Sequence, residues 1–243
     1  MLKNKIHIFS EPEETAESVA KLITAMLNEK VSAGKSLNIA ISGGSTPNLL
    51  FGMLSGEYAE KINWEKIRFF WVDERCVEPT DKESNYGNVN KILLQHVPIP
   101  EANIFRMKGE NVPIEEAVQY QNTLRNELPE VNGMPQFDLV LLGMGDDGHT
   151  ASIFPGNLEL LHSTESVAAA KHPQTGQNRI TLTGSVICNA KHVAFVITGH
   201  SKAEVLESIM HEKGDFERFP TYYILTGCGD VELYLDHEAA ERL

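Results

Sequence analysis

A histidine and an aspartate two positions apart, Asp147 and His149, stand in the glycine-rich segment LLGMGDDGHTASIFPG. A neutral imidazole beside a carboxylate that orients it is the usual apparatus of general base catalysis. A histidine in a loop often has no chemical role, so the pair alone leaves both interpretations open. A metal site has less support, because no second histidine follows at four residues and no nearby Cys or Glu completes a ligand set.

The three glycines of this segment, Gly143, Gly145 and Gly148, match the GxGxxG spacing of a dinucleotide-binding turn. Two aspartates inside the turn would repel a pyrophosphate. The motif also lies past the middle of the chain, whereas the dinucleotide fingerprint belongs to the first strand–helix unit. We therefore expect no nucleotide cofactor.

A second candidate is the segment SGGSTP at residues 42–47, between a predicted strand and a predicted helix. Gly43 and Gly44 let the backbone approach a ligand, and the unpaired N–H groups at the helix start favour an anion. Ser45 and Thr46 add hydroxyl donors. The same composition also suits a tight strand-to-helix turn, so phosphate binding is one of two open interpretations.

Charged residues follow a buried apolar run at 67–72, where packing rarely explains them. Arg75 is a candidate cation for a substrate oxygen, and Asp73 a candidate carboxylate in the same pocket; a surface ion pair is the alternative. Later in the chain, Arg179 and Lys202 could each reach a phosphate. Taken alone, each is more simply a solvated charge.

Apolar runs alternate with amphipathic segments almost from end to end, which predicts an α/β fold with a mainly parallel sheet and helices on both faces. Ser84 and Ser201 precede two of the helices and are candidate caps. We expect a single domain over residues 1–243, with a small lobe from about 145–185. The predicted strands are 5–9, 37–41, 67–72, 137–142, 167–170, 179–182, 193–198 and 222–225, and the predicted helices are 19–31, one from about 47, 85–96, 114–128 and 202–211.

The composition narrows the classes of partner. The chain has 243 residues with 21 Lys plus Arg and 34 Asp plus Glu, a net charge of 21 − 34 = −13, and shows no basic stripe, which argues against nucleic acid. No apolar run is long enough to span a membrane or form a signal peptide. Cys76, Cys188 and Cys228 lack a CxxC pattern and fit reduced thiols in a cytoplasm. We expect a soluble, cytoplasmic monomer or weak homodimer.

Taken together, the segments SGGSTP, WVDER followed by SNYGN, LLGMGDDGHTASIFPG, RITLT and GHSKAEVL occur in the order found in 6-phosphogluconolactonases. The chain resembles that family over nearly its whole length, within a broader sugar-phosphate isomerase-like superfamily that includes glucosamine-6-phosphate deaminase. The resemblance implies a three-layer α/β fold with a sugar-phosphate site at the carboxyl ends of the strands. It also implies hydrolysis of 6-phosphogluconolactone in the oxidative pentose phosphate pathway, without metal or organic cofactor.

The resemblance also assigns roles to residues. His149 would activate water with Asp147 beside it, and Arg75 would lie near the reacting carbonyl. Asp73 stays a further catalytic candidate from the residue pattern, as a carboxylate in the same pocket. The phosphate would be held by Gly43, Gly44, Ser45, Thr46, Arg179 and Lys202.

Two rival functions remain at this stage. Deaminases typically read DEY where this chain has Asp73-Glu74-Arg75, and carry a functional Glu five residues after the loop histidine, where this chain has Phe154. Both departures favour the lactonase. A non-catalytic sugar-phosphate-binding module is the other rival, and the intact Asp147/His149 pair argues against it.

Overall fold

The computed structural model describes residue 2 and residues 4–243. The strands are β1 (Lys5–Phe9), β2 (Leu37–Ile41), β3 (Ile67–Trp71), β4 (Asp73–Arg75), β5 (Ile104–Phe105), β6 (Glu130–Val131), β7 (Met134–Pro135), β8 (Leu139–Leu142), β9 (Val167–Lys171), β10 (Asn178–Leu182), β11 (Val193–Ile197) and β12 (Val231–Asp236). The helices are α1 (Pro12–Ser32), α2 (Ser45–Ser55), α3 (Asn85–Ile92), α4 (Pro113–Glu127), α5 (Gly184–Cys188), α6 (Ala203–His211) and α7 (Pro220–Gly227).

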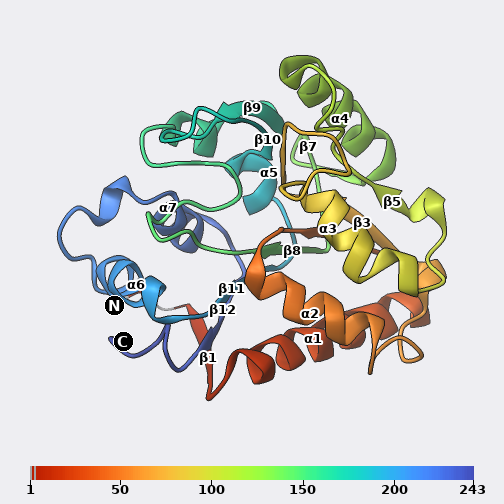
Figure 1. The fold of residues 1–243 in the computed structure, drawn as a ribbon, viewed down its shortest axis with the longest axis horizontal. Coiled ribbons are helices and arrows are strands. Elements are labelled where there is room, and N and C mark those ends of the chain that lie inside the picture. Colours follow the sequence, from red (N-terminus) through yellow and green to blue (C-terminus); the bar gives the residue numbers. More distant parts are fainter. Residues whose placement is uncertain (1, 3) are drawn as a thin grey trace.

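The main sheet has seven strands in the order β1-β12-β11-β8-β2-β3-β5, and every neighbouring pair is parallel. Up to β5 the chain adds strands toward one edge, and from β8 onward it adds them in the opposite direction. Because crossovers between parallel strands are right-handed, this reversal places α1 to α3 on one face and the segments with α4 to α7 on the other. The predicted parallel sheet with helices on both faces is confirmed (Figure 1).

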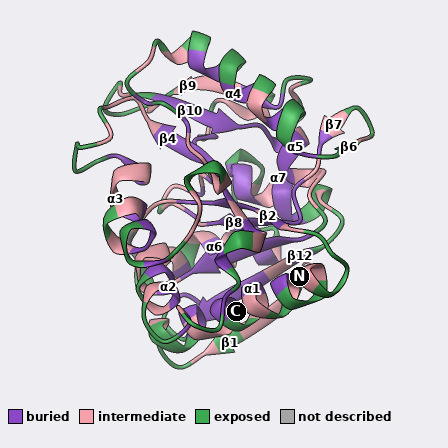
Figure 2. Ribbon diagram, turned by 90° about the vertical axis from the view of Figure 1, so that its right-hand side faces the viewer, coloured by how far each residue is buried: buried purple, intermediate pink, exposed green. Residues whose placement is uncertain are grey.

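A second, antiparallel sheet has the order β4-β10-β9. Helix α4 packs against β9 and β10, and Figure 2 shows α4 with this sheet above the main one. Residues 145–185 contribute β9 and β10, whereas β4 directly follows β3. The end of a main-sheet strand is thereby tied to the second sheet, which becomes important at the site.

Burial of apolar strands holds the main sheet together. The strands β2, β3, β8 and β11 are almost wholly buried, as expected for parallel strands covered on both faces. Helix α1 starts with Pro12 and carries Glu13 and Glu14 in its first turn, all features that favour a helix start, and it buries Val19 and Ile23. In the described part of the chain, no helix combines the length and apolar character needed to cross a bilayer.

The segment 222–225, which the sequence predicts as a strand, lies inside helix α7, so that prediction is wrong. Its aromatic and β-branched residues favour strands. However, Pro220 starts the helix, and Thr221, Ile224 and Leu225 are buried at helical spacing. The last strand of the sheet is instead β12, with the sequence VELYLD, which the prediction omitted.

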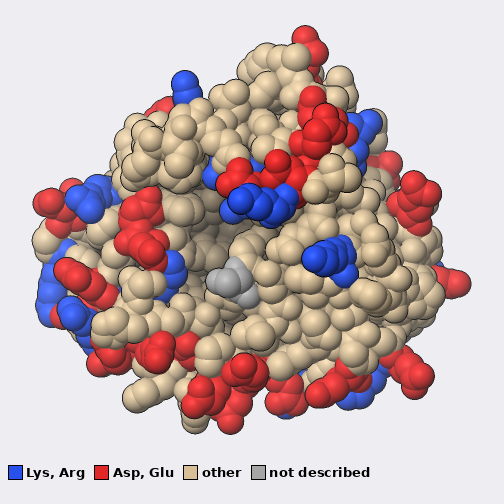
Figure 3. All heavy atoms as spheres, viewed as in Figure 1, with Lys and Arg blue, Asp and Glu red and all other residues tan. Residues whose placement is uncertain are grey.

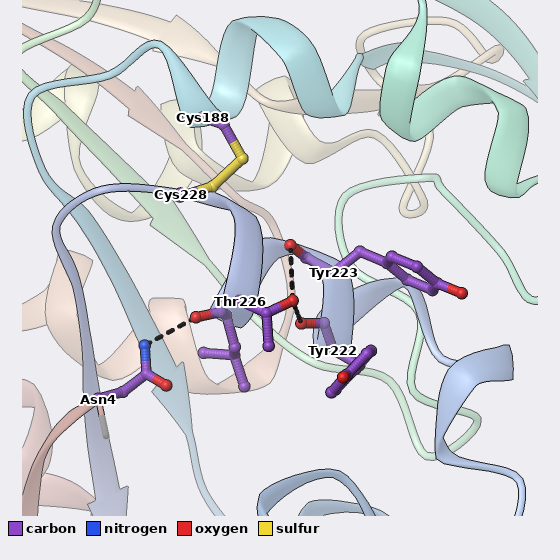
Figure 4. The surroundings of a disulfide bond; sticks show 7 residues. Asn4, Cys188, Tyr222, Tyr223, Thr226 and Cys228 are labelled. Carbon is purple, nitrogen blue, oxygen red and sulfur yellow. Dashed lines mark hydrogen bonds between the residues drawn. A yellow bond between two sulfur atoms is a disulfide. The ribbon is translucent and has the colours of Figure 1, made fainter. Parts of the chain in front are cut away.

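The expectation of three reduced thiols is also wrong, because Cys188 and Cys228 form a disulfide. The two cysteines are 40 residues apart in sequence, and their Cα atoms are 4.4 Å apart. They meet because the ends of α5 and α7 pack together (Figure 4). Spacing along the chain cannot reveal such a pairing, which depends on where two helices end. For these two residues, the cysteine-based argument for a reducing compartment does not hold.

Removing the disulfide should lower stability. In the chain-entropy model, a cross-link that closes a loop of this size contributes about 3–4 kcal/mol. Cys188→Ser should therefore lower the free energy of unfolding by about that amount in oxidising buffer. Urea unfolding with and without a reductant measures this, and the reduced wild type should match the variant. A wild-type protein that is equally stable in both buffers would contradict the prediction.

Candidate active site

The candidate site lies at the carboxyl ends of the central strands β2 and β8, where the order of strand addition reverses. In open parallel sheets, the loops diverge at this point and leave a crevice. A cavity of about 220 Å³ is found there, and Figure 3 shows this face of the molecule hollowed near its middle, with basic and acidic side chains on the rim. Of the predicted catalytic and phosphate-binding residues, those that line the cavity are Gly43, Gly44, Thr46, Asp73, Arg75, His149 and Lys202.

His149 and Asp147 form the expected pair. Asp147 Oδ1 accepts a hydrogen bond from His149 Nδ1 at 2.5 Å and another from the backbone N–H of His149 at 3.2 Å. Burial alone would raise the pKa of Asp147, but the hydrogen bonds and charge of His149 hold it below its ordinary value. With Nδ1 bound to an ionised carboxylate, Nε2 is the ring nitrogen left to take a proton.

The ring of His149 is held by two further residues. Gly145 lies so close that a Cβ at this position would be 2.2 Å from ring atoms Nδ1 and Cε1, so only glycine fits. On the other side is Phe154, which is buried and has its ring centroid 4.9 Å from that of His149. The glycine and the aromatic ring keep the imidazole in the orientation that Asp147 selects.

His172 lies next to the site but outside the cavity lining, and the sequence analysis gave it no role. Its ring lies 5.0 Å from Phe154, and its Nδ1 accepts backbone hydrogen bonds from Gln174 and Thr175 at 3.3 Å each. Burial and the positive charge of Arg179 lower the pKa of His172, so the ring is neutral at pH 7 and carries its proton on Nε2. The residues next to His172 in the sequence do not indicate its position or its lowered pKa, because Phe154 and Arg179 come from other segments.

Arg75 and Arg179 lie directly opposite each other on the antiparallel strands β4 and β10. The Nε atoms of both are buried and have no hydrogen-bond partner among the described residues. Arg75 donates to the carbonyl oxygen of Glu83 at 2.6 Å. Burial and the charge of Arg75 lower the pKa of Arg179. Two adjacent guanidinium groups repel each other, and a bound anion would relieve that repulsion. Arg75 lines the cavity, and Arg179 lies beside it outside the lining.

Asp73 is fixed by two side chains to which the sequence analysis gave no role. Its Oδ2 accepts a hydrogen bond from Ser152 Oγ at 2.7 Å, and its Oδ1 accepts one from Asn85 Nδ2 at 3.3 Å. Asn85 also packs on Gly43, where a Cβ would lie 2.0 Å from the amide oxygen. Asn85 therefore joins the loop after β2 to strand β4.

Glu74, between Asp73 and Arg75, organises the start of α3. Its carboxylate accepts backbone hydrogen bonds from Asn85 and Tyr86 at 2.7 Å each, and burial raises its pKa in spite of them. The predicted cap at Ser84 is confirmed, since its hydroxyl accepts a hydrogen bond from the backbone N–H of Gly87.

The predicted anion-binding turn leads directly into α2. Gly44 has a φ of 119°, a conformation that favours glycine, and α2 begins at Ser45, whose side chain lies outside the described part of the structure. Thr46 Oγ1 and Thr198 Oγ1 are 2.7 Å apart, which connects this turn to the loop after β11. The cavity is thus lined by the start of an α-helix, an arrangement that favours an anion.

Lys202 reaches the cavity from the short 3-10 turn His200–Lys202 after β11. Its ammonium group is ion-paired with Asp146, and this hydrogen bond holds the pKa of Asp146 below its ordinary value. The predicted cap at Ser201 is wrong, because Lys202 occupies the capping position. The Ser201 hydroxyl instead donates to Asp146 Oδ1 at 2.9 Å.

Cys76, the free cysteine of the described chain, should be unreactive at neutral pH. Burial and the nearby Glu74 carboxylate raise its pKa to about 11, so roughly one thiol in three thousand is ionised at pH 7.5. Labelling by iodoacetamide should therefore be slow and should accelerate roughly tenfold for each unit of rising pH below that value. Mass spectrometry measures the rate, with urea-unfolded protein as the control. Rapid labelling of the folded protein at pH 7.5 would contradict this.

A cluster of metal-ligating residues lies elsewhere, at the amino ends of β11 and β12. Ligand atoms of His192, Asp230 and Glu232 are within 4.8 Å of one another. Glu232 already accepts a hydrogen bond from Lys5 Nζ at 2.7 Å, and His7 Nε2 lies 2.8 Å from it. The charge of Glu232 is balanced by Lys5, and the cluster lies at the amino ends of the strands, away from the cavity at their carboxyl ends.

Fold and site together define an α/β protein whose cavity, lined by a helix start and by basic side chains, lies at the switch point of a parallel sheet. The chain belongs to the family of glucosamine-6-phosphate isomerases/6-phosphogluconolactonase, whose model matches residues 10–233. The resemblance drawn from the sequence motifs is therefore confirmed.

Individual relatives agree with this membership. The chain is 41% identical over 239 residues to the 6-phosphogluconolactonase of Haemophilus influenzae, and the match covers 97% of each protein. The crystal structure of devB protein superposes with a TM-score of 0.92 at 38% identity, covering 98% of this chain and 99% of that one. The 6-phosphogluconolactonase structure from Trypanosoma brucei gives a TM-score of 0.86 at 30% identity, with both chains covered completely.

Proposed function

We propose that this protein hydrolyses 6-phospho-D-glucono-1,5-lactone to 6-phosphogluconate in the oxidative pentose phosphate pathway. The observation that carries the proposal is that His149, hydrogen-bonded to Asp147, lines the same cavity as Arg75. A δ-lactone is an activated ester, so one base for water and one cation for the developing oxyanion suffice. The similarity to relatives named 6-phosphogluconolactonase over 97% of the chain supports the same reaction.

In the proposed mechanism, His149 Nε2 takes a proton from water as the water oxygen attacks the lactone carbonyl carbon. The carbonyl electron pair moves onto its oxygen, where Arg75 stabilises the negative charge. When that pair returns, the bond from this carbon to the ring oxygen breaks, and the ring oxygen takes the proton from the imidazolium. Asp147 keeps the ring oriented and stabilises its charged form. Asp73, whose carboxylate side chain lines the cavity, is the other candidate for the base.

The phosphate belongs at the end of the cavity formed by the start of α2 and by Lys202. A helix start and a lysine both favour an anion. Arg179, beside Arg75, adds a further positive charge to the site. The proposed phosphate-binding residues are Gly43, Gly44, Ser45, Thr46, Arg179 and Lys202.

The rival deaminase activity has less support from the site. An isomerising deaminase moves protons between carbon and oxygen and opens a ring, which requires additional acid–base groups. At the position of the deaminase glutamate, this chain has Phe154, which is buried and packs on His149. A non-catalytic binding module would need the phosphate-binding residues but no Asp147–His149 pair.

The proposal is tested by measuring hydrolysis of freshly generated 6-phosphogluconolactone above the spontaneous background. A parallel assay measures ammonia release from glucosamine 6-phosphate. We expect saturable lactone hydrolysis and no ammonia. Ammonia release without lactone hydrolysis would favour the deaminase, and binding of 6-phosphogluconate without either reaction would favour a binding module.

The remaining expectations are part of the same proposal. They are a cytoplasmic location, a monomer or weak homodimer, a reaction without metal or organic cofactor, and no nucleic-acid or membrane partner. The net charge of −13 supports the absence of a nucleic-acid partner.

A further inference from the structure

Asp146 stands at the phosphate end of the cavity, although the proposed chemistry does not need it. Its carboxylate is ion-paired with Lys202 and accepts a hydrogen bond from Ser201 Oγ at 2.9 Å. The side chain of Lys202 is 21% exposed and that of Asp146 is 68% exposed. Lys202 lines the cavity, whereas Asp146 lies outside the lining. The positive charge available to a phosphate is therefore partly neutralised by the protein's own carboxylate.

We propose that Asp146 is an internal counter-ion that competes with the ligand's phosphate for Lys202 and so sets the affinity for phosphate esters. This inference rests on the proposed function, which assigns Lys202 to the phosphate. A lysine ammonium has three donors that either a carboxylate or a phosphate can accept. A phosphate ester carries close to two negative charges at pH 7, so it attracts the lysine more strongly than the single charge of Asp146 does.

The competition makes Lys202 selective for ligands that carry a phosphate. A ligand with a neutral hydroxyl at this position cannot replace the ion pair, whereas a phosphate dianion can. Release of a phosphorylated product is favoured for the same reason, since Asp146 returns to Lys202 as the product leaves. Asp146 is a specificity-determining residue in this scheme, and it contacts no reacting atom.

The loop that carries Asp146 is closed on itself. The backbone N–H of Gly145 donates to the carbonyl oxygen of His149 at 2.9 Å, and that of Gly148 donates to the carbonyl oxygen of Gly145 at 3.0 Å. Asp147 is held separately by His149. Asp146 can therefore leave Lys202 by side-chain rotation while His149 keeps its hydrogen bond to Asp147. Asp146 should thus affect phosphate binding and not the chemical step.

The test is Asp146→Asn, which removes the charge and preserves the size and the acceptor for Ser201. Isothermal titration with inorganic phosphate and with 6-phosphogluconate measures the two dissociation constants. In low-salt buffer both should fall about threefold to tenfold, and the gain should shrink as salt is added. Binding of gluconate, which lacks the phosphate, should not change.

Glu204→Gln is the matched control. Glu204 is exposed, lies two residues from Lys202, and has no side-chain hydrogen bond or ion pair with it among the described residues. The variant makes the same change in net charge and should bind both probes as the wild type does.

Unchanged or weaker phosphate binding in the Asp146→Asn variant would overturn the inference, and so would an equal gain in the Glu204→Gln variant. Those outcomes leave the proposed function intact, because the wild type would still bind 6-phosphogluconate. A wild-type protein that binds neither probe would instead overturn the proposed function, and this inference with it.

Discussion

Replacing His149 by alanine is expected to lower kcat about 10²–10⁴-fold and to leave the affinity for 6-phosphogluconate nearly unchanged. A general base acts in the transition state, so its loss falls on kcat and not on ground-state binding. Asp147→Asn should have a smaller effect, because the imidazole stays packed against Phe154 and Gly145 and loses only the carboxylate that orients it. Rates are measured above a buffer blank, since the lactone also hydrolyses spontaneously.

The pH profile distinguishes a base from a structural histidine. A protonated imidazole cannot accept the proton of water, so the wild-type rate should fall as the pH is lowered, and this acid limb should be absent in the alanine variant. His162→Ala is the matched control, because His162 is exposed and lies on the same segment between β8 and β9. It should retain both kcat and the acid limb. A near-normal kcat in the His149 variant would contradict the assignment and leave Asp73 as the next carboxylate to test.

The parts of the site that follow from the sequence are local. The hydrogen bond between Asp147 and His149 spans two residues, and the predicted anion-binding turn consists of consecutive residues after a strand. The contacts that hold Asp73 are not local in this way, because Ser152 is 79 residues away from Asp73 in the chain. The sequence around Ser152 does not indicate a contact with Asp73, because the second sheet and the loop after β8 bring the two residues together only in the fold.

Lys202 illustrates the same limit. The sequence leaves open whether it is a solvated charge or a phosphate ligand, and the structure shows it lining the cavity while paired with Asp146. The two partners are 56 residues apart. They meet because β8 and β11 are neighbours in the sheet, so that the loops after both strands lie side by side.

The fold was predictable wherever burial leaves a strong local pattern. The strands β2, β3 and β11 are apolar apart from Asn38 and Arg68, because parallel strands are buried on both faces. The segment 222–225 misleads for a physical reason, since its side chains suit a strand and only burial at helical spacing after Pro220 makes it a helix. The disulfide between Cys188 and Cys228 likewise depends on a contact between two helix ends.

Replacing Lys202 by alanine is expected to raise KM for the phosphorylated lactone about ten- to a hundredfold, because a charge-assisted hydrogen bond contributes about 1.5–3 kcal/mol. The loss of Lys202 also leaves Asp146 without its ion pair, close to the incoming phosphate, and the repulsion adds to the penalty. The small rate on unphosphorylated gluconolactone should stay nearly the same, since that substrate leaves the phosphate end of the cavity empty. Steady-state kinetics on both lactones measure the difference.

Two further variants make this result specific. Lys213→Ala removes an exposed lysine that is paired with Glu207 at 3.0 Å, away from the cavity lining, and should leave KM unchanged. Adding Asp146→Asn to Lys202→Ala should recover part of the lost affinity, because it removes the repulsion and leaves the missing donor unreplaced. Equal losses on the two lactones in the Lys202 variant would show instead that the lysine acts on the fold or on the chemistry, and the phosphate assignment would be wrong.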